Sequence, residues 1–126
     1  MRASAGMGRQ MGKFLFTADY SSASWARLVN SSDDRFATVN AVMESLGGSL
    51  EVLYWTAYDG TSHCIADLPD LVAARAFVTA AFKTGAFKSV KVEELLTQDQ
   101  LRDTLVLARS AETFYQAPGQ AAVERN

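Results

Sequence analysis

The order of helix-like and strand-like segments is the feature that most constrains this fold. Apolar residues recur at three- and four-residue spacing over residues 33–46, and Gly47-Gly48 then offers the left-handed exit that a helix end favours. A second stripe of this kind runs over residues 71–82, after the punctuating Leu68-Pro69-Asp70 and before Thr84-Gly85. The sequence therefore predicts two amphipathic helices, well separated along the chain.

Four strand-like segments surround these helices. Residues 13–20, 50–58, 61–67 and 87–96 are rich in β-branched or aromatic residues or alternate between apolar and polar ones. Between the middle two lies Asp59-Gly60, a dipeptide typical of a two-residue type I′ turn. This arrangement predicts a β-hairpin between the two helices.

Two shorter helical signals complete the pattern. Residues 24–29 can form a helical turn, and residues 97–100 have the spacing of a capping box that starts a further helix up to Ala108. We expect a flexible N-terminal extension over residues 1–12, a single domain over residues 13–115 and a disordered tail over residues 116–126.

The predicted order of elements is β-α-β-β-α-β followed by an extra C-terminal helix. This is the α+β ferredoxin-like plan, in which two helices cover one face of a four-stranded antiparallel sheet. The other face is left to water or to a partner.

Composition removes several classes of function. The net charge of -2 gives no basic field for nucleic acid, and the apolar runs are too short for a membrane span. The single cysteine, Cys64, excludes an intramolecular disulfide. With one histidine, His63, it cannot supply the ligands of a zinc site unless carboxylates or a second copy of the chain contribute. We expect a cytoplasmic protein without metal or cofactor.

The hairpin holds the residues with chemical potential. A two-residue turn would pair Tyr58 with Thr61, Thr56 with His63 and Tyr54 with Ile65. Four ligand-binding candidates would then share one face: Tyr54, Thr56, Tyr58 and His63. Cys64 would point to the opposite face, under the helices, as a small buried hydrophobe, which disfavours a thiolate–imidazole pair.

Three short motifs, in this order and spacing, resemble the GYD domain family of the dimeric α+β barrel superfamily. They are Leu46-Gly47-Gly48, Asp67-Leu68-Pro69-Asp70 and Leu95-Leu96-Thr97, and the resemblance extends from Lys13 to Leu107. The namesake Gly-x-Tyr-Asp motif is not intact, because Tyr58-Asp59-Gly60-Thr61 occupies its place. The resemblance implies a homodimer of apposed sheets, and it implies no particular reaction.

Three functions remain open. The first is a homodimer that binds a small, partly apolar ligand between its sheets, since aromatic-lined clefts are common binding sites. The second is a cofactor-independent oxygenase or isomerase with His63 as proton acceptor and Tyr54 or Tyr58 as orienting groups. The third is an assembly module whose free face is filled by its twin. A lone histidine on a strand is more often a packed or solvated polar residue than a catalyst.

Overall fold

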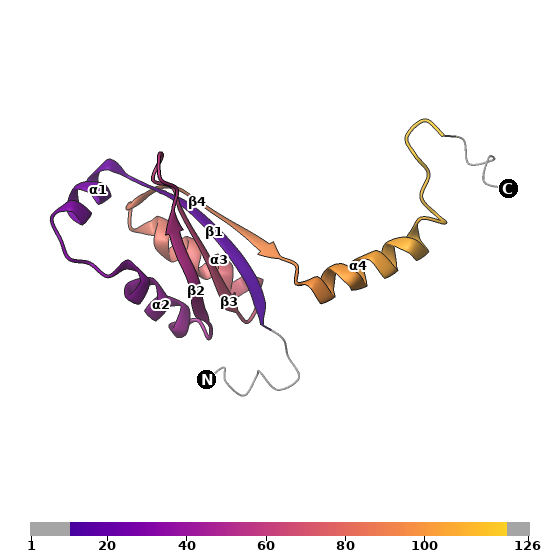
Figure 1. Cartoon of the computed structure of the whole chain (residues 1–126), viewed down its shortest axis with the longest axis horizontal. Coiled ribbons are helices and arrows are strands. Elements are labelled where there is room, and N and C mark those ends of the chain that lie inside the picture. Colours follow the sequence, from indigo (N-terminus) through magenta and orange to yellow (C-terminus); the bar gives the residue numbers. More distant parts are fainter. Residues whose placement is uncertain (1–10, 121–126) are drawn as a thin grey trace. The chain divides into compact units, whose positions relative to one another are not determined.

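The computed structural model describes residues 11–120 (Figure 1). The chain divides into two compact units, one ending at Leu95 and the other beginning at Leu96. The first unit holds a four-stranded sheet and three helices, and the second holds one helix. Residues 1–10 of the predicted N-terminal extension and residues 121–126 of the predicted tail lie outside the described residues.

All four strands pair antiparallel in one sheet. The strands are β1 (Gly12–Tyr20), β2 (Ser49–Trp55), β3 (Ser62–Leu68) and β4 (Phe87–Leu95). Their order across the sheet is β2-β3-β1-β4, so β1 pairs with both β3 and β4. The α+β class and the four-stranded antiparallel sheet predicted from the sequence are confirmed, and the topology is consistent with the ferredoxin-like plan.

Each helix of the first unit begins at a side-chain cap. These helices are α1 (Ser22–Val29), α2 (Arg35–Ser45) and α3 (Leu71–Lys83). The Ser21 hydroxyl accepts a hydrogen bond from a backbone N–H of α1, and the Asp34 and Asp70 carboxylates do the same for α2 and α3. These caps satisfy N–H groups that have no partner inside the helix, which explains why the helices start at these residues.

The core lies between one sheet face and the helices α2 and α3. Phe14 and Phe16 of β1 are almost completely buried, as is Leu68 of β3. Met43 of α2 and Ala74 of α3 join the same cluster with no exposed surface. Because both helices contribute to one cluster, they cover the same face of the sheet, and the alternate residues of each strand face the other way.

Two adjacent glycines between α2 and β2 serve different purposes. Gly47 has φ of 92°, the left-handed conformation that ends the helix. At Gly48 an added Cβ would lie 1.8 Å from the carbonyl oxygen of Asp67. The second glycine is therefore required for the close approach of the chain to β3, beyond the helix exit predicted from the sequence.

The turn between β2 and β3 differs from the predicted two-residue type I′ turn. Trp55 pairs with Ser62, and the N–H of Gly60 donates to the carbonyl of Thr56 at 3.0 Å. Gly60 has a positive φ of 71° but Asp59 does not, whereas a type I′ turn needs positive φ at both. The loop is therefore longer, and it changes which residues face each other across the hairpin.

The helix of the second unit is α4 (Gln98–Ala111). The Thr97 hydroxyl accepts from the N–H of Gln100 at 3.1 Å, and the Gln100 side chain accepts from the N–H of Thr97 at 2.9 Å. This reciprocal pair is the capping box predicted from the sequence, which is confirmed. The apolar residues Leu101 and Leu105 of α4 are exposed.

Candidate functional site

Two of the four predicted ligand-binding residues lie together on the sheet face that α2 and α3 leave open. Tyr54 of β2 stands opposite His63 of β3, and Thr17 of β1 flanks His63 on its other side. His63 is half-buried, whereas 69% of Tyr54 is exposed. The predicted pairing of Tyr54 with Ile65 is wrong, because Ile65 pairs with Val52.

The other two predicted residues belong to the loop after β2. The Thr56 hydroxyl donates a hydrogen bond to the Asp59 carboxylate, and the N–H of Thr61 donates to the Thr56 hydroxyl oxygen at 3.1 Å. The bond from Thr56 holds the pKa of the Asp59 carboxyl below its usual value. Tyr58 is fully exposed. The predicted pairing of Thr56 with His63 is therefore wrong, since the loop uses Thr56 to hold its own backbone.

His63 carries an unsatisfied polar atom. Its Nε2 is buried and has no hydrogen-bond partner within the described part of the chain. Cys64, the next residue, is buried on the opposite face, as predicted, and burial raises the pKa of its thiol to about 12. The thiol therefore stays protonated at neutral pH, and the alternation of β3 keeps it away from the imidazole.

The open face combines an apolar middle with a charged end. Leu15, Val52 and Ile65 are half-buried there. At one end the Lys13 ammonium lies 2.6 Å from a Glu51 carboxylate oxygen and 2.9 Å from an Asp67 carboxylate oxygen. Hydrogen bonds to Glu51 and Asp67 raise the pKa of Lys13, so this group stays charged.

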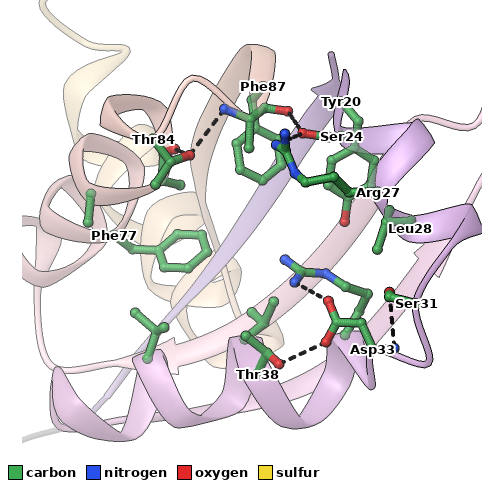
Figure 2. A pocket seen from close by; sticks show the side chains of 16 residues that line it. Tyr20, Ser24, Arg27, Leu28, Ser31, Asp33, Thr38, Phe77, Thr84 and Phe87 are labelled. Atoms are coloured by element: carbon green, nitrogen blue, oxygen red, sulfur yellow. Dashed lines mark hydrogen bonds and ion pairs between the residues drawn. The ribbon is translucent and has the colours of Figure 1, made fainter. Parts of the chain in front are cut away.

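A cavity of about 490 Å³ lies on the helix side of the sheet, among α1, α2 and α3 (Figure 2). No periodic pattern in the sequence predicts this cavity. Apolar side chains of α2, α3 and the strand ends form most of its wall. Polar residues of α1, of the α1–α2 loop, of α2 and of the end of α3 form the rest. The cavity is lined by Tyr20, Ser24, Arg27, Leu28, Ser31, Asp33, Arg35, Thr38, Val39, Val42, Phe77, Ala80, Ala81, Thr84, Ala86 and Phe87.

Aromatic rings give the cavity a firm apolar wall. Tyr20 and Phe87 stack at a centroid distance of 5.0 Å with 27° between their planes. Phe77 meets the core residue Phe16 edge to face at 4.9 Å. Such ring pairs add to the stability gained from area burial. The contact between Phe77 and Phe16 joins this wall to the core rather than to a loop.

A hydrogen-bonded group of charges occupies the polar side. An Nη1 of Arg35 donates to the Asp33 carboxylate at 2.8 Å, and the Thr38 hydroxyl donates to the same carboxylate at 3.2 Å. Burial opposes the charge on the Arg35 guanidinium, but hydrogen bonds to Asp33 and Tyr20 outweigh it and raise the pKa of Arg35. The Arg35 bond in turn lowers the pKa of the Asp33 carboxyl.

A second guanidinium, that of Arg27 in α1, also lines the cavity. Figure 2 shows Arg27 extending toward Ser24, whose hydroxyl oxygen accepts from a guanidinium nitrogen of Arg27 at 3.3 Å. The Ser24 hydroxyl itself donates to the carbonyl of Ala86 at 2.7 Å. Ser24 thereby links α1 to the segment before β4 and fixes the position from which Arg27 reaches.

One signal in the sequence points to this cavity. Arg35 is the first residue of α2, where the helix dipole disfavours positive charge. Asp33-Asp34 supplies the negative charge that a helix start favours, yet only Asp34 caps the helix, and Asp33 binds Arg35. A cation at a helix N-terminus, next to an acid that it neutralises, is the local departure from helix rules that accompanies many functional sites.

The described residues, 11–120, include no group of three or more His, Cys, Asp or Glu side chains able to hold a metal ion. Over the same range, no helix combines the length and apolarity that crossing a membrane requires.

Comparison with known proteins supports the resemblance predicted from the sequence. The GYD domain model matches residues 14–105, which confirms that prediction. No curated protein matches the chain. A similar solved structure is the crystal structure of PA3566 from Pseudomonas aeruginosa, with 14% sequence identity and a TM-score of 0.48, covering 70% of this chain and 94% of that one.

Proposed function

We propose that this chain, which belongs to the GYD domain family, is a binding protein for a small, partly apolar molecule. The observation that carries the proposal is the cavity of about 490 Å³ among α1, α2 and α3. Ligand sites typically have volumes of roughly 300–1,000 Å³ and mostly apolar walls with a few polar groups. The proposed ligand site is thus on the helix side of the sheet rather than on the open face.

The chemistry of the cavity favours binding over turnover. No histidine or cysteine is among the described residues that line it, and Asp33 is their one carboxylate. Because Arg35 and Thr38 both donate to Asp33, its pKa is lowered and it is a weak general base. The polar groups can orient a ligand, but none is arranged to transfer a proton.

The open face supports a second proposal, self-association as a dimer of apposed sheets. The half-buried Leu15, Val52 and Ile65 form an apolar strip, and the buried Nε2 of His63 lacks a partner. Packing this strip against a second copy would remove apolar surface from water and offer His63 a hydrogen-bond partner. Sedimentation velocity across a range of protein concentrations checks this, and a monomer at all concentrations would exclude it.

Nile red, a neutral apolar fluorophore, tests the ligand proposal. Titration of the full chain is expected to give a saturable, blue-shifted emission. Ala80→Trp places an indole at the cavity wall on α3, and we expect it to weaken binding at least tenfold. Ala76→Trp is the matched control, because Ala76 is an exposed residue of α3 outside the cavity lining. Equal binding by both variants, or no saturable binding to the wild type, would overturn the proposal.

A further inference from the structure

The charges that line the cavity do not balance. Arg27 and Arg35 contribute two positive charges, and Asp33 contributes the one negative charge, so one positive charge remains. Arg35 is paired with Asp33, so the excess charge belongs to Arg27, whose side chain is exposed and is available to an anionic ligand. This excess is a property of the site itself, since the whole chain has a net charge of -2.

Arg35 retains hydrogen-bonding capacity after its ion pair is made. A guanidinium has five N–H donors in a fixed plane, and the hydrogen bonds to Asp33 and Tyr20 use only part of that set. Its Nε is buried and has no hydrogen-bond partner among residues 11–120. Arg35 therefore brings to the cavity N–H donors that its bonds to Asp33 and Tyr20 do not use.

Within the described residues, Arg27 makes weaker interactions than Arg35 does. No carboxylate within the described range lies within ion-pair distance of it, and its contact to Ser24 is long at 3.3 Å. Its side chain is exposed, at the edge of the cavity, so it can meet a ligand without first breaking an ion pair. Arg27 therefore supplies a free positive charge, and Arg35 an already oriented one.

We infer that the ligand is an amphipathic monoanion, a molecule with one carboxylate on an apolar, ring- or chain-like body. This inference rests on the proposed ligand-binding function of the same cavity. The carboxylate binds Arg27 and the remaining N–H donors of Arg35, since planar guanidinium and carboxylate groups match in geometry. The apolar body lies against Phe77 and Phe87. A dianion such as a phosphate monoester would leave one charge uncompensated.

The volume sets the scale of the apolar body. At about 30 Å³ per water molecule, the cavity of about 490 Å³ holds the equivalent of roughly sixteen waters. A bicyclic aromatic acid therefore fits this space. The inferred ligand is thus a small acid.

Two isosteric probes separate charge from shape: naphthalene-2-carboxylate and the neutral naphthalene-2-carboxamide. By isothermal titration calorimetry at low salt, the full-length protein is expected to bind the carboxylate at least tenfold more tightly than the amide. Arg27→Gln is expected to remove that preference while leaving the affinity for the amide unchanged. Arg35→Lys, which keeps the charge but loses the planar donor set, is expected to reduce the preference in part.

The matched control is Arg75→Gln, which removes the same charge from an exposed position of α3 outside the cavity lining. It should keep the full preference for the carboxylate. Equal affinity of the wild type for the two probes would overturn the inference, as would loss of preference in Arg75→Gln to the extent seen in Arg27→Gln.

The two sets of binding measurements distinguish a wrong ligand class from a wrong binding function. If Nile red binds and Ala80→Trp blocks it, but the acid shows no advantage over the amide, the cavity binds ligands and the inferred class is wrong. If neither Nile red nor either naphthalene probe binds, the proposed function is wrong, and the inference is wrong with it.

Discussion

The two faces of the sheet carry similar residue types but bury them differently. On the covered face, Phe14 and Leu68 have no exposed surface, and Cys64 is nearly as deep. On the open face, Leu15 and Ile65 stand next to them in sequence and are only half-buried. Strand alternation therefore determines which residues form the core, and the helices, rather than residue type, determine how deeply each one is buried.

The largest difference is expected from matched leucine truncations. Leu68→Ala removes a fully buried side chain and should lower the free energy of unfolding by about 3–5 kcal/mol. Leu15→Ala removes a half-buried side chain and should cost the isolated chain about 1 kcal/mol. Urea unfolding at low protein concentration measures both values.

The same pair tests the proposed role of the open face. If two copies associate through this face, the cost of Leu15→Ala will grow with protein concentration, because unfolding is then linked to dissociation. The cost of Leu68→Ala will not show this added dependence. Equal costs for the two truncations at low concentration would show that the open face is already covered within the chain.

The Cys64 thiol gives a smaller, pH-dependent contrast. Burial raises its pKa from 9.0 to about 12, so at alkaline pH the thiol loses its proton in the unfolded chain but keeps it in the folded one. Stability is therefore full below pH 9 and falls as the pH rises toward 12. Between pH 8 and pH 10 this group alone should reduce the free energy of unfolding by about 1.4 kcal/mol.

Cys64→Ala supplies the control, because tyrosines and lysines also titrate in this range. The difference between wild type and Cys64→Ala in urea midpoint at the two pH values isolates the thiol. Parallel losses in the two proteins would mean that Cys64 is accessible in the folded state, contrary to its 6% exposure.

The pattern of residues along the chain was sufficient to predict the order of helices and strands and which sheet face the helices cover. The caps, the glycine exits and the period of the strands are local signals, and Cys64 lies under the helices as its position relative to His63 predicts. The pairing across the hairpin is less local. A register shift between Leu50 and Val52 places Leu50 in the core, although simple alternation assigns it to the same face as Tyr54.

The candidate site was less predictable than the fold. Asp59-Gly60 permits a two-residue turn, but the Thr56 hydroxyl bonds the Asp59 carboxylate and stabilises a longer loop, which separates Thr56 and Tyr58 from His63. The cavity depends on residues that the chain brings together from distant segments, such as Ser24 and Ala86. No periodic pattern marks such an assembly, and only the charge of Arg35 at a helix start signals it.

The smallest effect is expected from the ionic end of the open face. Lys13 bridges Glu51 and Asp67, and their side chains are 37%, 47% and 32% exposed, so water and salt screen the pairs. Lys13→Gln should therefore lower the free energy of unfolding by about 1 kcal/mol or less, and by less still in 1 M salt. Paired urea melts at low and high salt measure this. A loss as large as that of Leu68→Ala would mean that the bridge is desolvated, as it would be beneath a second sheet, and the contrast between the faces would then hold only for the single chain.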